Sequence, residues 1–292
     1  MDNASVQTHW RELSARAKAH AATCGLELVP EDLGNPYARY ATLKMHSLDG
    51  NAMEARLIVP VSEGPHPVVL AFHDANRGVR GWQHLTRFVA LGYAVLSLRN
   101  RPGVAGVLVP EPLSVGDGLG VAMRVGAEQA PRLYRQLDPE TQQALAGTYT
   151  DALVLAHACT RIEGVAAERL LCWGEGLGAG LALVVGSLVP VLGVAALNPL
   201  PAALDASAAE VDVARISAGL AAPVLLGSCL LDLQATPEAQ DVVATGLTQA
   251  RRLRYPRYTH ERVNAFEDEL LAFLARFELS QDGRRTSANI KD

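Results

Sequence analysis

The stretch RLLCWGEGLGAGLALVVGSLV, residues 169–189, decides the architecture of this chain. Its beginning, 169–174, is a short apolar run typical of a buried strand, and 177–188 is an apolar stretch long enough for a helix. The glycine-rich turn between them brings backbone amides to the start of the helix, where an anion or an oxyanion is stabilised. The sequence therefore predicts a strand, a sharp turn and a helix, with a candidate site at the turn.

Similar short apolar runs occur on both sides of this unit. Further strands are expected at 67–73, 93–98, 191–197, 223–228 and 252–256, and further helices at 80–91, 139–160, 237–249 and 262–278. Strands that are apolar throughout and alternate with helices are typical of a parallel sheet covered on both faces. Two alternating runs, 38–47 and 52–60, are separated by an Asp-Gly turn and predict an antiparallel hairpin. Together these patterns predict an α/β fold with an eight-stranded, mostly parallel sheet flanked by helices.

The two ends of the chain differ from this pattern. Residues 5–24 have apolar side chains at helical spacing, so we expect residues 1–36 to be an N-terminal helical extension. The α/β domain is expected over 37–280, and 281–292 is expected to be a polar tail. The stretch 102–117 contains Pro and Gly and is expected to be a long loop.

Composition excludes several classes of protein. With 49% hydrophobic residues and 20% charged residues, the chain of 292 residues can bury a large core. A net charge of −5 lacks the basic excess that phosphate binding requires, so nucleic acid is not an expected partner. The four cysteines are far apart and form no CxxC pair, which favours free thiols in a reducing compartment and no metal site. Without a signal-like start or a long apolar segment, we expect a soluble cytoplasmic protein with no membrane partner.

The turn at 174–178 reads Gly-Glu-Gly-Leu-Gly and admits two chemical interpretations. It fits the frame of the G-x-S-x-G nucleophile elbow, with Gly176 where the serine should stand. It also fits the dinucleotide fingerprint G-x-G-x-x-G/A through Gly174, Gly176 and Ala179. That fingerprint needs an acidic residue about twenty positions later for the ribose, and none occurs between Glu175 and Asp205. The elbow interpretation is therefore favoured.

A nucleophile elbow requires an acid after a later strand and a histidine after the last strand. Asp232 follows the strand expected at 223–228, and His260 follows the strand expected at 252–256. Taken singly, Asp232 could be a helix-capping carboxylate and His260 a surface histidine. Because ligand sites lie at the carboxyl ends of parallel strands, their joint placement favours a triad-type site.

Six segments of the chain are similar to one known family: PVVLAFHDANRG, LGYAVLSLRNR, YTDALVLAHA, ERLLCWGEGLGAGLAL, APVLLGSCLLD and YPRYTHERVNAFEDELLAFL. Over about residues 40–278 the sequence resembles the acetyl xylan esterase and cephalosporin C deacetylase branch of the α/β-hydrolases. The resemblance implies an α/β-hydrolase fold, deacetylation of small acetylated sugars and ring-like oligomers. It also implies that Asp232 and His260 complete the catalytic triad.

The chain departs from this family at its chemical centre. The family's serine falls on Gly176, its oxyanion-loop tyrosine falls on Ala75, and its Arg-Gly-Gln turn reads Arg-Asn-Arg at 99–101. Glycine has no oxygen or sulfur nucleophile, so the acyl-enzyme route is closed. Neither Cys172, which precedes the turn, nor Ser187, at the far end of the following helix, is placed to substitute for the missing hydroxyl.

The remaining site residues follow from the same frame. The backbone amides of Leu177 and Ala75 are the expected first and second oxyanion donors. The expected pocket residues are His73, Asp74, Glu175 and Trp82. His73 is interpreted as a residue that braces its loop, and Glu175 as a solvated or ion-paired structural carboxylate.

Three hypotheses about function follow. In the first, the chain keeps the fold and the pocket for binding or assembly and has little or no esterase activity. In the second, it is an active carbohydrate esterase whose natural sequence has Ser at 176, or which uses a water activated by His260 with both oxyanion amides intact. In the third, it binds a dinucleotide at the glycine-rich turn. Under the first two hypotheses, the expected partner is a small ester or an acetylated sugar. The chain is then expected to form homo-oligomers and to need no cofactor.

Overall fold

The structure is a computed structural model that describes residues 2–75, 79–101, 137–232, 234–257 and 263–278. The predicted loop at 102–117, the tail at 281–292 and His260 lie outside the described residues.

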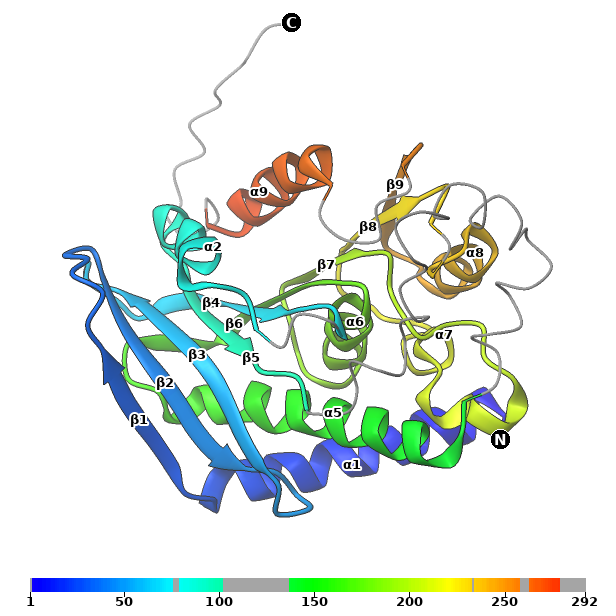
Figure 1. Cartoon of the computed structure of the whole chain (residues 1–292), viewed down its shortest axis with the longest axis horizontal. Coiled ribbons are helices and arrows are strands. Elements are labelled where there is room, and N and C mark those ends of the chain that lie inside the picture. Colours follow the sequence, from blue (N-terminus) through cyan, green and yellow to red (C-terminus); the bar gives the residue numbers. More distant parts are fainter. Residues whose placement is uncertain (1, 76–78, 102–136, 233, 258–262, 279–292) are drawn as a thin grey trace, which may run out of the picture.

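One sheet of nine strands runs through the described part of the chain, in the order β1-β2-β3-β5-β4-β6-β7-β8-β9 (Figure 1). The strands are β1 Leu26–Glu31, β2 Ala38–His46, β3 Ala52–Pro60, β4 His66–Phe72, β5 Ala94–Leu98, β6 Val165–Glu175, β7 Gly193–Leu197, β8 Val224–Cys229 and β9 Ala250–Tyr255. Neighbours pair antiparallel from β1 to β5. They pair parallel from β5 to β9. The predicted mostly parallel α/β sheet is confirmed.

Helices cover both faces of the sheet. They are α1 Asn3–Thr23, α2 Trp82–Thr86, η2 Arg87–Leu91, α5 Pro139–Ala158, η3 Cys159–Arg161, α6 Leu177–Leu188, η4 Ala206–Val211, α7 Val213–Ile216, α8 Pro237–Gly246 and α9 Asn264–Glu278. Helices α1, α5, α6, α7 and α8 contribute to one apolar core. Helices η2 and α9, with part of α2, contribute to a second core on the opposite face.

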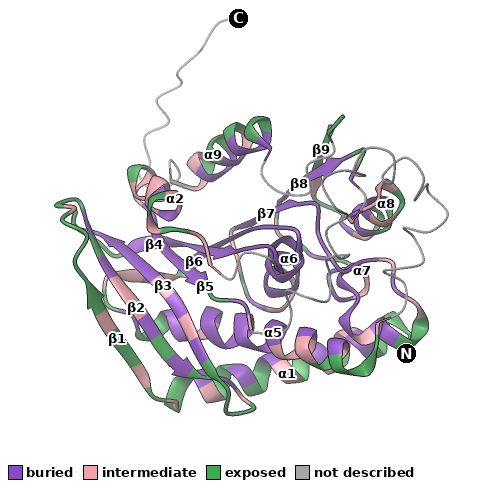
Figure 2. Cartoon of the chain, viewed as in Figure 1, coloured by how far each residue is buried: buried purple, intermediate pink, exposed green. Residues whose placement is uncertain are grey.

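Strand β4 shows why the central runs are apolar at every position. Val68 and Leu70 point into the core shared with α6, whereas Val69 and Ala71 point into the core shared with α9. Since successive side chains of a strand alternate between faces, both sets must be apolar when both faces are covered. Figure 2 shows the central strands and α6 buried and the outer strand β1 largely exposed.

The prediction of eight strands is one short, because β1 was not foreseen. Its sequence, LELVPE, is short and polar and contains Pro30, which argues against a strand inside a sheet. At the edge of a sheet a proline is tolerated, and β1 pairs only with β2 among the described strands. The segment 1–36, predicted to be a helical extension, therefore supplies a strand as well as α1.

Helix α1 is anchored by its apolar face. Trp10 is fully buried, packs on Tyr149 of α5 with ring centroids 5.5 Å apart, and donates its indole N–H to the carbonyl of Glu210 at 2.6 Å. A buried indole whose N–H is bonded contributes a large apolar area without an unsatisfied donor. Helix α1 is thus part of the folded core.

The turn between β6 and α6 depends on very close backbone contacts. A Cβ atom added to Gly174 would lie 2.0 Å from the carbonyl oxygen of Gly178, and one added to Gly178 would lie 2.4 Å from the carbonyl group of Phe72 in β4. Both distances are far below van der Waals contact with backbone atoms, which cannot move aside as a side chain can. Glycine at these two positions brings the start of α6 against the end of β4.

We predict that Gly178→Ala lowers the free energy of unfolding by about 3 kcal/mol or more, because the added methyl group overlaps the backbone of Phe72. Gly25→Ala is the matched control, since nothing lies within 4 Å of its added Cβ. Urea unfolding followed by circular dichroism measures both. Equal stability of the two variants would contradict the close packing described for the turn.

Candidate active site

The turn after β6 has the backbone geometry of a nucleophile elbow. Gly176 has φ 56° and ψ −123° and is the N-cap of α6. This conformation is strained for a residue with a side chain, and in an elbow it exposes the central hydroxyl. The turn is held to the end of β7 because the N–H of Gly176 donates to Leu197 at 2.9 Å and its carbonyl accepts from Leu200 at 3.1 Å. The elbow is therefore present, and its central residue has no side chain.

The carboxylate of Asp74 accepts a hydrogen bond from the backbone amide of the residue that follows Gly176. The N–H of Leu177 donates to Oδ1 of Asp74 at 2.9 Å, and both residues are buried. Leu177 is the first residue of α6, where the helix dipole and the unpaired N–H groups favour a negative charge. The Leu177 amide, the expected first oxyanion donor, is thus already hydrogen-bonded to a side-chain oxygen of the chain itself.

The loop that carries Asp74 is braced from β5 and the residues after it. His73 is fully buried, and its Nε2 shares a 2.6 Å hydrogen bond with the hydroxyl of Ser97. The side-chain amide of Asn100 donates to the carbonyl groups of His73 and Asp74 at 3.2 and 3.0 Å. Ala75, the expected second oxyanion residue, directly follows and packs into the core. These contacts fix the position of the Asp74 backbone.

Glu175 forms a buried ion pair with Arg80, and only 1% of the Glu175 side chain is exposed. This agrees with its interpretation as an ion-paired structural carboxylate. Arg80 in turn accepts a hydrogen bond at its carbonyl from the guanidinium of Arg56. No local sequence pattern indicates Arg80 or Arg56 as a partner here, because both lie on segments far from Glu175 along the chain.

Asp232 lies in the loop after β8, as predicted, and is buried. Its Oδ1 accepts hydrogen bonds from the backbone amides of Gln234 at 2.7 Å and Ala235 at 3.1 Å, so the carboxylate braces the loop that leads to α8. His260 lies outside the described residues. The pairing of Asp232 with His260 therefore stays a prediction.

Trp82, an expected pocket residue, contacts side chains of β2 and β3. The guanidinium of Arg56 lies 4.7 Å from the Trp82 ring centroid, and the ring of Tyr40 packs edge-on at 5.5 Å. Trp82 lines a cavity over β1, β2 and β3 that contains none of the other predicted site residues. Its place as a pocket residue near the elbow stays a prediction.

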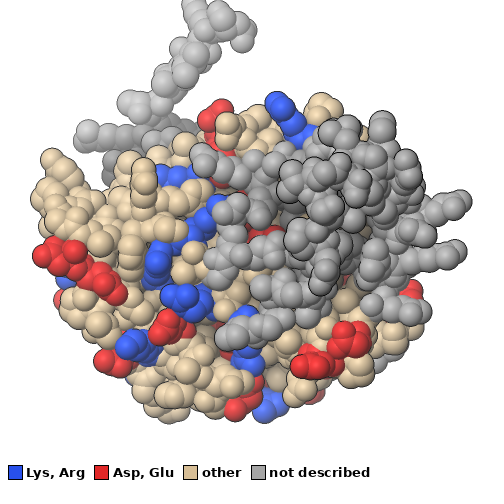
Figure 3. All heavy atoms as spheres, viewed as in Figure 1, with Lys and Arg blue, Asp and Glu red and all other residues tan. Residues whose placement is uncertain are grey.

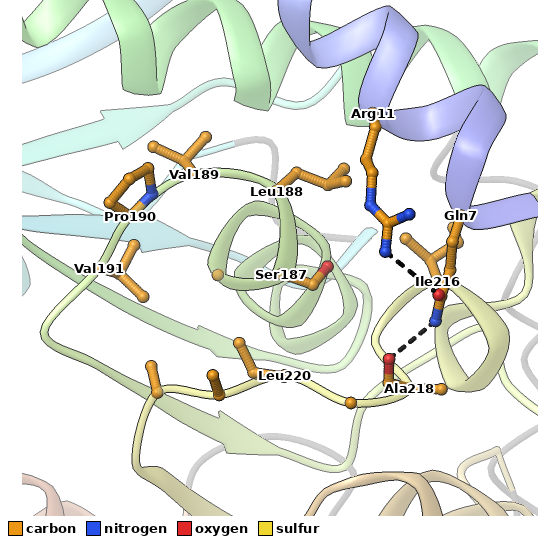
Figure 4. A pocket seen from close by; sticks show the side chains of 14 residues that line it. Gln7, Arg11, Ser187, Leu188, Val189, Pro190, Val191, Ile216, Ala218 and Leu220 are labelled. Atoms are coloured by element: carbon orange, nitrogen blue, oxygen red, sulfur yellow. Dashed lines mark hydrogen bonds between the residues drawn. The ribbon is translucent and has the colours of Figure 1, made fainter. Parts of the chain in front are cut away.

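Neither of the two residues considered as substitutes for the serine can act as one. Cys172 is buried in the core, and burial raises the pKa of its thiol far above neutral pH. Ser187 lies in the last turn of α6, and its hydroxyl donates to the carbonyl of Val184. Ser187 and Arg11 both line a cavity of about 570 Å³, and Ser187 lies at the end of α6 opposite the elbow. Figure 4 shows the side chains that line this cavity.

The described residues contain neither a metal-binding cluster nor a membrane-spanning helix. No group of three His, Cys, Asp or Glu side chains there could hold a metal ion. The same residues include no helix with the length and hydropathy needed to span a membrane.

The family model described as "Acetyl xylan esterase (AXE1)" matches residues 6–201, more than half of the chain. The chain belongs to the acetyl xylan esterase family. The match includes the elbow and the Asp74 loop but ends before Asp232 and His260. The scaffold of this member is therefore that of an esterase with the α/β-hydrolase fold, and its Asp-His pair is not covered by the family match.

Solved structures support the fold. Acetyl xylan esterase 1 from Thermoanaerobacterium sp. is 20% identical, with a TM-score of 0.71 over 92% of this chain and 93% of that chain. An acetyl xylan esterase from Paenibacillus sp. is 18% identical, with a TM-score of 0.68 over 92% and 94%. An esterase from Pyrobaculum calidifontis is 16% identical, with a TM-score of 0.53 over 96% and 93%. A search of curated proteins found no match.

We predict that Asp74→Ala lowers the free energy of unfolding by about 1–3 kcal/mol, because it leaves the buried Leu177 amide without its acceptor. Asp74→Asn is the matched control, since its side-chain oxygen still accepts the hydrogen bond, and it should cost less. Urea unfolding of the two variants tests this order. If Asp74→Ala were as stable as the unmodified chain, the hydrogen bond between Asp74 and Leu177 would contribute nothing to stability.

Proposed function

We propose that this chain is a member of the acetyl xylan esterase family that binds an acetylated sugar or a similar small ester without hydrolysing it. The observation that carries the proposal is the Asp74 carboxylate on the Leu177 amide, beside an elbow whose residue 176 has no side chain. Two requirements of ester hydrolysis, a nucleophile and a free oxyanion donor, are thus missing at one place.

The electrostatics at the turn oppose acyl transfer independently of the missing serine. In ester hydrolysis a negative charge develops on the carbonyl oxygen, and donors such as the Leu177 amide stabilise it. A carboxylate that already accepts this hydrogen bond both removes the donor and repels the developing charge. Loss of one such donor costs about 10²–10³ in rate in other enzymes.

The same contact weighs against the two alternatives. A water activated by His260 would need the Leu177 oxyanion donor that Asp74 now engages. A dinucleotide would place its pyrophosphate at the N-terminus of α6, where the carboxylate of Asp74 lies and like charges repel. Of the functions considered, binding without turnover fits the geometry best.

A cytoplasmic location and assembly into homo-oligomers are parts of this proposal. The free thiols of Cys24, Cys159, Cys172 and Cys229 support a reducing compartment. The family resemblance in the sequence supports oligomers, which light scattering at several protein concentrations can measure.

Turnover of 4-nitrophenyl acetate tests the catalytic part of the proposal. We expect the unmodified chain and Gly176→Ser to remain near background, because the serine alone leaves Asp74 on the Leu177 amide. The double variant Gly176→Ser with Asp74→Ala should be at least about 10²-fold faster than Gly176→Ser. Adding His260→Ala to the double variant should remove that gain.

Two outcomes would contradict this account. Turnover by the unmodified chain that disappears in His260→Ala would replace it with a water-mediated hydrolase. Equal activity of Gly176→Ser and the double variant would show that Asp74 does not block the oxyanion site. Asp74→Ala alone is the control for changes that are unrelated to a serine nucleophile.

Calorimetric titration tests the binding part. Acetylated xylo-oligosaccharides should bind the unmodified chain more tightly than the same oligosaccharides after chemical deacetylation, because the proposed ligand is recognised at its ester. Equal affinity for the two preparations, or no binding of either, would overturn the proposed ligand class. The loss of catalysis is tested separately, by the turnover of 4-nitrophenyl acetate.

A further inference from the structure

A cavity of about 320 Å³ opens on the side of the sheet where β1, β2 and β3 carry half-exposed polar side chains. Trp82, the first residue of α2, forms one wall. Figure 3 shows Lys and Arg side chains gathered over α2 and β3 on this face, with acidic groups among them. The lining residues are Val29, Glu31, Thr42, Lys44, Glu54, Ala55, Arg56, Val79, Trp82 and Arg99.

Most of the charges that line the cavity have a partner of opposite sign. Lys44 lies opposite Glu27 on one neighbouring strand and opposite Glu54 on the other. Arg99 forms an ion pair with Glu54 at 3.0 Å. The carboxylate of Glu31 accepts a hydrogen bond from the hydroxyl of Thr42 at 2.7 Å. Two of the three cations that line the cavity, Lys44 and Arg99, therefore lie opposite or beside an acidic side chain.

Arg56 is the third cation, and the residues opposite it on the two neighbouring strands are neutral, while the charges of Arg99 and Glu31 act on it with opposite signs. It lies opposite Thr42 on β2 and opposite Ser97 on β5, and among the described residues it forms no ion pair. Its guanidinium donates to the carbonyl of Arg80 and stacks on the Trp82 ring. Partial burial and then the nearby charge of Arg99 lower the pKa of Arg56. An anion placed beside these two guanidinium groups would offset both effects.

We propose that this cavity binds a small oxyanion, the carboxylate or phosphate group of a small molecule, held by Arg56 and Arg99 with the rest of the molecule against Trp82. Guanidinium groups offer paired N–H donors that match the oxygen atoms of both anions. The indole ring adds an apolar wall for a sugar ring or a carbon chain. The site uses none of the residues of the elbow, so the inference does not depend on the proposed function.

The stack between Arg56 and Trp82 prepares the site for its anion. A guanidinium held on an aromatic ring loses less side-chain freedom on binding than a free one, and partial burial strengthens its attraction for an anion. The carbonyl of Arg80 holds the same guanidinium from another side. Arg56 is therefore oriented before any ligand arrives.

Tryptophan fluorescence reports on the cavity directly. The chain has three tryptophans, of which Trp10 and Trp173 are 0% and 1% exposed, whereas Trp82 is half-buried. We expect iodide, an anion, to quench the emission more strongly than caesium, a cation, with acrylamide as the neutral reference. In Arg56→Gln the preference for iodide should shrink.

Titration at constant ionic strength then tests specific binding. D-Glucuronate and inorganic phosphate are the two anionic probes, and D-glucose is the neutral match of glucuronate. We expect a saturable change in Trp82 emission with at least one anion and none with glucose, and at least a tenfold weaker affinity in Arg56→Gln. The relative response to glucuronate and phosphate decides between a carboxylate and a phosphate ligand.

The controls separate binding from altered folding. Arg254→Gln removes an exposed arginine of β9 that pairs with Asp241, far from this cavity along the sheet, and should leave the titration unchanged. Arg99→Gln removes an exposed side chain from the cavity and gives a second test if Arg56→Gln does not fold. The proposal is overturned if glucose and glucuronate act alike, if neither anion gives saturation, or if the cavity variants titrate like the unmodified chain.

Discussion

Close backbone contact between the end of β4, the turn after β6 and the start of α6 is the constraint on which the site depends. The glycines at 174 and 178 allow this contact because any side chain there would overlap backbone atoms. Once α6 begins so near β4, its first amide faces the loop that follows β4. The hydrogen bond between Leu177 and Asp74 follows from that approach and joins residues 103 positions apart in the sequence. Packing thus fixes the place of the site before any reacting group is considered.

Under the proposed function, the chain uses this place differently from an ester hydrolase. In an ester hydrolase, the positive end of a helix and an unpaired amide stabilise an oxygen that gains charge only in the transition state. Here the acceptor is a side-chain oxygen of the chain itself, which is in place before any ester binds. Asn100 and His73 hold the loop backbone around it. The same scaffold that would stabilise a reacting ester therefore stabilises a loop of the folded chain.

The sequence predicted those parts of the fold that are set by burial on both faces. The central strands were foreseen because a strand covered on both faces, such as β4, is apolar along most of its length. Helix α6 was foreseen because its stretch is apolar and long enough for a helix. Strand β1 was missed because at the edge only one side of it is paired, so Pro30 and its polar neighbours are tolerated. The elbow was foreseen from its glycines. The role of Asp74 was not, since a hydrogen bond between distant segments leaves no local pattern. The contacts of Trp82 with Arg56 and Tyr40 were not foreseen for the same reason.

The two departures at the site are physically coupled. With glycine at 176 the elbow has no hydroxyl nucleophile, and beside it the carboxylate of Asp74 accepts the hydrogen bond of the Leu177 amide. With the carboxylate in place, a serine at 176 would attack an ester whose developing charge lacks one donor and faces an anion. Restoring a serine at 176 alone, or removing the Asp74 carboxylate alone, would therefore not restore ester hydrolysis. A site altered in this way retains its shape and its buried polar contacts, and these are properties on which binding depends more than catalysis does.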